Sequence, residues 1–201
     1  MVSNAMLDIM VSRRSIRRFQ PEPVEREVIT ALLQAAIWAP SAHNRQPWRF
    51  CVVDSVETKE HLASAMGARL RSDSARDGIA PELIEKDAAR SYARMTGAPV
   101  LIVLSLSMID MDHYNDEVRN LNEYVMAAQS TAMAGQNLLL AAQQAGLATC
   151  WMCAPMFCPD VVRAVLDLPD DWQPQALIAL GYAAEIRAKT RRPLEASVLW
   201  R

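Results

Sequence analysis

Apolar positions along the chain alternate between helical spacing and the short continuous runs of buried strands. Spacings of three and four residues predict helices over 24–38, around 56–66 and over 159–166. Aromatic, β-branched or wholly apolar runs predict strands at 48–53, 99–105, 148–152 and 175–181. Helices and strands do not alternate regularly, and no Gly-x-Gly-x-x-Gly turn occurs. The pattern therefore favours the α+β class, with one mixed or antiparallel sheet packed among helices.

The longest helical pattern spans residues 117–144 and ends before Gly146. At 1.5 Å per residue, such a helix would run about 40 Å. Its apolar and small residues leave almost no polar side, so most of its faces must be buried. This predicts either a central core helix or a subunit interface.

The segment from 69 to 98 shows no single pattern, because charged and apolar residues are mixed between Arg69 and Arg94. It predicts either one or two short helices or a mobile flap. Residues 1–5 precede a second methionine, resemble a remnant of cloning, and carry no structural weight. The length suits one domain over residues 1–201.

Composition narrows the class of protein. The 21 basic and 23 acidic residues give a formal charge of −2, which argues against a nucleic-acid partner. The apolar stretches are too short to span a bilayer, and no secretory signal is visible, so neither a membrane partner nor export is expected. Four cysteines do not make a disulfide scaffold, and a cytoplasmic protein is the expectation. Because only three of the basic residues are lysines, a single arginine is weak support for anion binding.

Two polar segments carry groups suited to an anionic ligand. Residues 13–19 (Arg-Arg-Ser-Ile-Arg-Arg-Phe) combine four guanidinium groups with a hydroxyl, and both kinds of donor suit phosphate. Residues 39–48 (Ala-Pro-Ser-Ala-His-Asn-Arg-Gln-Pro-Trp) form a loop rich in amide and hydroxyl groups between two prolines. Taken singly, the first is also compatible with a solvated basic run and the second with an ordinary helix-to-strand connection.

Together, these segments resemble the FMN-dependent nitroreductase family. The resemblance extends to the long helix, to Gly-Leu-Ala-Thr-Cys-Trp at 146–151, to Ala-Leu-Gly-Tyr at 179–182, and to Lys-Thr-Arg-Arg-Pro at 189–193. Within the family, the chain is most similar to the nitroreductase-like C-terminal domain of bifunctional deazaflavin-coenzyme gamma-glutamyl ligases. The segments 149–152 and 161–172 carry that closer similarity.

The resemblance implies a homodimer that holds FMN at the subunit interface, with the flavin rather than a protein side chain carrying the chemistry. It places four residues at the FMN phosphate, ribityl chain and pyrimidine edge: Arg13, Arg14, Ser15 and Arg17. It places Ser41, Asn44 and Gln46 at the flavin of the partner subunit, and Lys189 and Arg191 at the phosphate. No residue is assigned as a general acid or base.

One departure from the family pattern lies after the strand at 148–152. The family often has a glycine there whose backbone approaches the flavin, whereas this chain has Pro155. Proline has no N–H to donate. A backbone bond to the flavin ring would therefore come from Cys153 or Ala154.

Cys150, Cys153 and Cys158 also suggest a dithiol or metal site. A metal would need a fourth ligand, and the three histidines offer no local pairing, so no metal is expected. A dithiol would need an exposed cysteine at a helix N-terminus, whereas Cys150 ends an apolar strand. Small buried apolar residues are the favoured interpretation of these cysteines.

The leading functional hypothesis is an oxidoreductase that passes hydride from NAD(P)H through FMN to a small-molecule acceptor, such as a nitroaromatic, a quinone or another conjugated compound. One alternative is a reductase of a deazaflavin coenzyme precursor. Another is a flavin-binding carrier or sensor without turnover.

Overall fold

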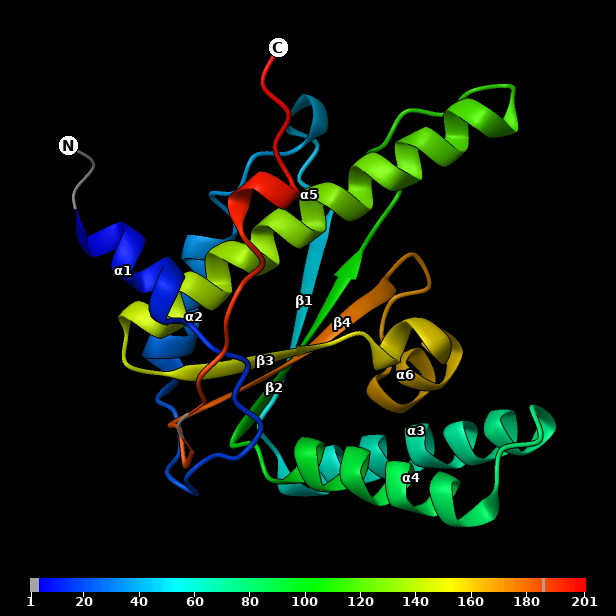
Figure 1. The fold of residues 1–201 in the computed structure, drawn as a ribbon. Helices are drawn as coiled ribbons and strands as arrows, with labels where there is room; N and C mark the ends of the chain where they lie inside the picture. The colour runs from blue at the N-terminus through cyan, green and yellow to red at the C-terminus, as the bar shows by residue number, and fades with distance from the viewer. Residues whose placement is uncertain (1–3, 186) are drawn as a thin grey trace.

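The protein folds as a four-stranded sheet between two groups of helices (Figure 1). This computed structural model describes residues 4–185 and 187–201. The strand order is β1 (Trp48–Val53), β2 (Val100–Leu106), β4 (Gln173–Gly181) and β3 (Ala148–Met152). Every neighbouring pair is antiparallel, which confirms the α+β class and settles the sheet as antiparallel.

The helices follow the predicted order, with one addition at the N-terminus. They are α1 (Asn4–Ser12), α2 (Arg26–Ala36), α3 (Val56–Arg76), α4 (Pro81–Thr96), α5 (Glu117–Gln144) and α6 (Pro159–Leu166). Short 3-10 turns are η1 (Ala42–Asn44), η2 (Ala154–Phe157) and η3 (Leu194–Ala196). Residues 4 and 5 of the supposed cloning remnant belong to α1, and residues 1–3 lie outside the described part.

The sheet is buried on both faces, and β2 shows why its sequence is continuously apolar. Val100, Ile102 and Leu104 join the core formed with α2 and α5. Leu101 and Val103 point the other way, into the core formed with α3, α4 and α6. Successive side chains of a strand point to opposite faces, so a strand between two helical layers needs apolar residues at every position.

The segment 69–98 is helical, as one of the two alternatives predicts, but its helices are longer than expected and it forms no irregular flap. Helix α3 continues ten residues past the predicted end at Met66, and α4 returns beside it as a helical hairpin (Figure 1). The extension is fixed by polar pairs: Arg71 binds Glu85 of α4, and Arg69 binds Asp160 of α6. An apolar pattern cannot reveal a helix that is held by such pairs.

Helix α5 begins and ends where the sequence predicts. The Asp116 side chain accepts a hydrogen bond from the N–H of Arg119, and Gly146 adopts a φ of 75° after the helix. One face is buried in the subunit, whereas Val118, Leu121 and Val125 stay exposed. The prediction of burial on most faces therefore fails within one subunit. No helix among the described residues has the length and apolarity to cross a membrane.

Helix α5 approaches the sheet most closely at Gly135. A Cβ atom there would overlap the Trp151 ring and lie 2.9 Å from Leu104 Cδ2. We expect Gly135→Ala to lower the free energy of unfolding by about 1–3 kcal/mol, because the core must shift to accept the methyl group. Denaturant unfolding of the holoprotein measures it.

Gly67→Ala, in α3, is the matched control. There the added Cβ meets only Arg71 Nη1, at 3.2 Å, the guanidinium nitrogen that does not bond to Glu85. Replacing an unstrained helical glycine with alanine stabilises by about 0.5–1 kcal/mol. Equal effects of the two substitutions would contradict the close approach at Gly135.

Candidate cofactor site

The two ends of the chain meet at the edge of the sheet. The N–H of Ile16 donates to Thr149 O of β3 at 3.0 Å. The N–H of Gln20 then donates to Tyr182 O at 2.9 Å, just after β4. The N–H of Arg17 donates to Glu185 Oε1 at 3.0 Å. The N-terminal arginine segment is thus held between β3 and the C-terminal segment.

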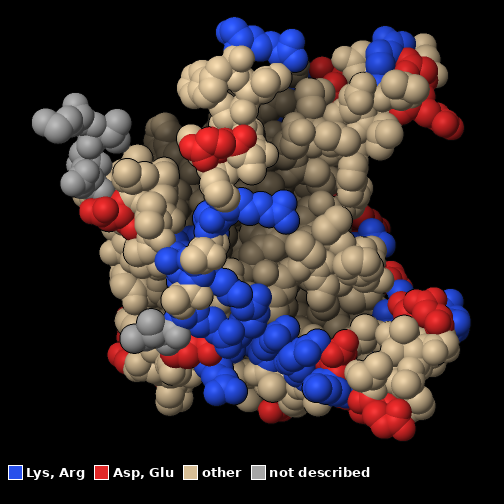
Figure 2. All heavy atoms as spheres, in the orientation of Figure 1, with Lys and Arg blue, Asp and Glu red and all other residues tan. Residues whose placement is uncertain are grey.

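This meeting forms a basic pocket of about 240 Å³, which we call the clamp pocket. It is lined by Arg13, Arg14, Ser15, Arg17, Arg187, Lys189 and Arg191. All six residues predicted from the two chain ends are present together. No carboxylate is among the described residues that line it. Figure 2 shows the lysine and arginine side chains gathered in one band across this face.

The charges of the clamp pocket are only partly compensated. Burial lowers the pKa of Arg13, and the nearby charges of Arg191 and Arg14 lower it further. At its margin, hydrogen bonds from the Arg187 side chain and the Arg17 N–H lower the pKa of Glu185 to about 2. That carboxylate stays ionised at neutral pH and fixes both chain ends. The remaining cations favour an anionic ligand.

Arg187 was missed by the sequence analysis. It stands two residues before Lys189 and four before Arg191, so the three side chains alternate along an extended segment. In an extended chain, alternate residues lie on the same side. This period of two was the available signal, but the high arginine content of the chain concealed it.

The loop that carries Ser41, Asn44 and Gln46 is tightly shaped. His43, Asn44 and Gln46 have φ values of 49°, 55° and 51° and account for three of the four non-glycine residues with positive φ in the described chain. Ser41 Oγ accepts a hydrogen bond from the Gln46 N–H at 3.1 Å. Asn44 and Gln46 are exposed. Strained backbone of this kind clusters at ligand sites.

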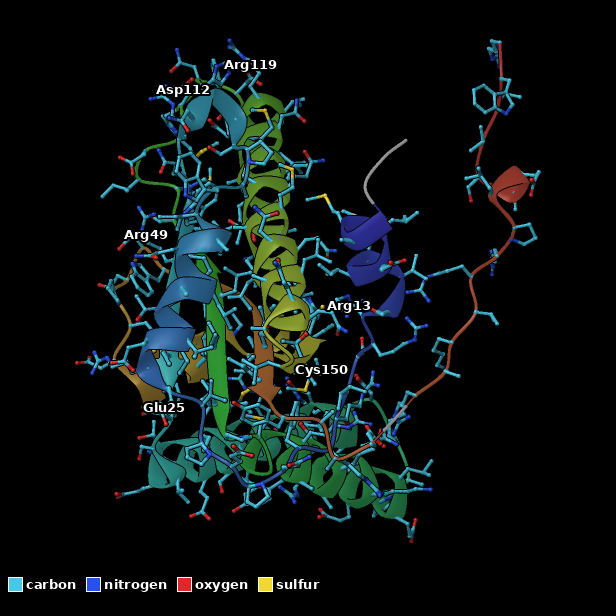
Figure 3. The ribbon with its side chains drawn as sticks, turned by 90° about the vertical axis from the view of Figure 1, so that its left-hand side faces the viewer. Arg13, Glu25, Arg49, Asp112, Arg119 and Cys150 are labelled. Atoms are coloured by element: carbon cyan, nitrogen blue, oxygen red, sulfur yellow. The ribbon has the colours of Figure 1, made fainter. Side chains whose placement is uncertain are left out.

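This loop does not reach the clamp pocket of its own subunit. The N–H of Ala42 donates to Ser130 Oγ of α5, whereas Gln143 of α5 donates to Ser12 Oγ beside the clamp. Thirteen residues of helix separate these contacts, or roughly 20 Å. In Figure 3, Asp112, which pairs with Arg45 of the loop, lies far along α5 from Arg13.

The segment after β3 borders a second pocket, of about 250 Å³. Cys153 and Ala154 are exposed, and Pro155 is buried. The pocket is lined by Met66, Arg69, Leu70, Asp73, Ser74, Asp77, Ser91, Ala154, Phe157 and Cys158. The α3–α4 hairpin therefore forms one wall of a cavity that opens beside the predicted flavin-contacting backbone.

The cysteines of this region differ in environment. Cys150 and Cys158 are buried, and burial raises the pKa of both thiols, as expected for small apolar residues. Cys153 is exposed, and its Sγ accepts a hydrogen bond from Trp151 Nε1 at 3.2 Å. No cluster of three or more metal-ligating side chains occurs within the part of the chain that the structure describes.

Comparison with known proteins identifies the family. The model of the nitroreductase family matches residues 10–182. This chain belongs to the nitroreductase family. A curated relative, an NADH dehydrogenase of Thermus thermophilus, is 33% identical, with 95% of this chain and 93% of that protein covered.

Solved structures of nitroreductases share the fold. A putative nitroreductase from Desulfovibrio desulfuricans, described in complex with FMN, is 28% identical with a TM-score of 0.76. The match covers 100% of this chain and 98% of that chain. The nitroreductase NfnB of Mycobacterium smegmatis, in complex with NADPH, has a TM-score of 0.76 at 24% identity, and each chain is fully covered. At that identity the likeness speaks for the fold alone.

Proposed function

We propose that this nitroreductase is an FMN-dependent oxidoreductase that takes hydride from NAD(P)H and reduces a small conjugated acceptor. The observation that carries the proposal is the clamp pocket, where cationic groups from both ends of the chain converge around Ser15. The FMN that is named in the D. desulfuricans structure supports the same cofactor here. Bound FMN would supply the redox chemistry by accepting the hydride and passing reducing equivalents to the acceptor.

The donor set of the clamp pocket fits the FMN phosphate. A phosphate monoester carries nearly two negative charges at neutral pH and accepts several strong hydrogen bonds. The pocket offers six cationic side chains and the Ser15 hydroxyl, with no lining carboxylate among the described residues to compete. Arg13, Arg191 and Ser15 would hold the phosphate, and Arg17 would face the ribityl chain and the pyrimidine edge.

We assign the remaining predicted contacts to a second copy of the chain. The loop with Asn44 and Gln46 lies too far along α5 to serve the clamp pocket of its own subunit. Exposed apolar residues follow α5 at helical spacing (Val118, Leu121, Val125), and Trp200 of the tail is 87% exposed. Exposed apolar surface of this extent marks an interface. A homodimer that covers α5 would carry each loop to its partner's clamp pocket.

An enzyme is favoured over a flavin carrier by the pocket beside Ala154. Met66, Leu70 and Phe157 give it apolar walls, which suit a planar conjugated acceptor. In this arrangement the N–H groups of Cys153 and Ala154 would orient the flavin edge. The acceptor would then lie against the α3–α4 hairpin.

The visible spectrum and turnover of the purified protein test the proposal. We expect a yellow protein with one FMN per subunit, whose flavin band bleaches anaerobically with NADH or NADPH and returns on addition of an acceptor. The acceptor panel should contain quinones, nitroaromatics and a deazaflavin precursor, since the similarity to the ligase domains remains a prediction. FMN that neither nucleotide reduces would identify a carrier, and exclusive FAD binding would refute the cofactor.

A further inference from the structure

A second group of arginines lies directly beside the clamp pocket. Arg18, Arg90 and Arg94 join Arg17 and Arg187 around a cavity of about 260 Å³, which we call the outer pocket. Arg17 and Arg187 line both pockets, so the two cavities adjoin at these side chains. The basic band in Figure 2 follows this surface.

The positive side chains around the outer pocket repel one another when no ligand is bound. Arg90 and Arg94 stand four residues apart on α4, and like charges at that spacing repel each other. Arg94 is half-buried, and its pKa is lowered by burial and then by the charges of Arg17 and Arg90. Asp87 pairs with Arg90 and Glu185 with Arg187, but neither carboxylate lines the cavity. This arrangement favours a bound anion.

FMN carries a single phosphate. It therefore cannot place a phosphate in the clamp pocket and another in the outer pocket. The clamp pocket already offers six cations to that group. An anionic group in the outer pocket would therefore belong to another ligand that binds next to the flavin. The proposed hydride donor is such a ligand, and its two natural forms differ only in the 2′-phosphate of the adenosine ribose.

We propose that Arg18, Arg90 and Arg94 bind the 2′-phosphate of NADPH and make the enzyme selective for NADPH over NADH. The proposal rests on the proposed function, since it presumes a pyridine nucleotide as donor. Arginine suits the role because its planar fork of donors matches phosphate oxygens. Helix α4 lines the pocket beside Ala154 with Ser91. It would then also bind the 2′-phosphate of NADPH with Arg90 and Arg94.

The test compares two nucleotide fragments on the FMN-loaded protein. Calorimetry gives the Kd for 2′,5′-ADP and for 5′-AMP in the wild type, in Arg90→Ala/Arg94→Ala, and in Lys86→Ala. Lys86 is an exposed cation of α4 that does not line the outer pocket, so its loss is the matched control. We expect 2′,5′-ADP to bind at least about tenfold more tightly than 5′-AMP in the wild type and the control. In the double variant, the preference should fall to about one.

Steady-state kinetics with both donors gives a second readout. In the double variant, kcat/KM for NADPH should fall about 10- to 100-fold more than kcat/KM for NADH. Retained FMN and an unchanged unfolding midpoint show that the variant is folded. Equal binding of the two fragments by the wild type would overturn the proposal.

A different role for these arginines gives a different result. If they act on the flavin, the double variant shifts the reduction potential of bound FMN and leaves the ratio of NADPH to NADH efficiency unchanged, which also overturns the proposal. Failure of the proposed function is distinguishable, because then neither donor reduces the flavin. An enzyme that oxidises both donors with equal efficiency overturns the proposed selectivity for NADPH, whereas the proposed function stands.

Discussion

A heterodimer of two inactive variants is expected to recover about half of the wild-type activity, because a two-fold dimer has two equivalent sites and one would be intact. One subunit carries Arg13→Ala and Arg191→Ala, and the other carries Asn44→Ala and Gln46→Ala. In a composite site, both lesions fall together in one site, and the second site takes an intact clamp pocket and an intact loop. Activity per purified heterodimer, co-expressed with two affinity tags, measures the recovery.

The two homodimeric parents are the controls for this experiment. Each should be nearly inactive, because every one of its sites carries a lesion. If the loop and the clamp pocket served the flavin of the same subunit, each site of the heterodimer would also carry one lesion. Activity at the mean of the parents would then refute the composite site, whereas the separation of the two groups along α5 predicts recovery.

Loss of two cations from the clamp pocket should nearly abolish FMN binding. Each charged hydrogen bond to phosphate contributes about 1.5–3 kcal/mol, or roughly 10- to 150-fold in affinity. Arg13 and Arg191 come from opposite ends of the chain and line the same pocket. We expect Arg13→Ala/Arg191→Ala to weaken FMN by about 10²- to 10⁴-fold, as measured by fluorescence titration of the apoprotein.

Arg192→Ala is the appropriate control for the double variant. It removes one charge from the residue next to Arg191 in the exposed tail, but Arg192 does not line the clamp pocket. Its effect on FMN affinity should stay within about twofold, since it removes only a screened charge. Comparable losses of FMN affinity in Arg192→Ala and in the double variant would show that the overall positive charge, and not the clamp pocket, retains the cofactor.

Elements with strong local signals were predicted almost to the residue. Helix α5 has an acidic side chain that caps its first turn and a glycine that ends it, and β2 is an almost continuous apolar run. The second half of α3 has no such signal, because its side chains pair with charged partners on other helices. Its length depends on tertiary contacts that no local pattern contains.

The residues of the candidate site also form two groups, those that the sequence could assign and those that only the fold reveals. The arginine motif at 13–17 and the basic pair at 189 and 191 could be assigned from resemblance, and the fold brings them together. Arg90 and Arg94 carried no usable signal, since arginine is the usual basic residue of this chain and α4 carries charges of both signs. Only the packing of α4 beside the N-terminal segment reveals that they share a cavity with Arg17.

The pairing of the two chain ends determines when the cofactor site can form during synthesis. The bond between the Arg17 N–H and Glu185 joins residues 168 positions apart. Contacts of such sequence separation form late, and a ribosome releases the N-terminal segment long before its partner exists. The arginines at 13–17 are therefore synthesised at least 168 residues before the carboxylate that accepts the Arg17 hydrogen bond. FMN bound in the clamp pocket would therefore stabilise a contact that forms late in folding.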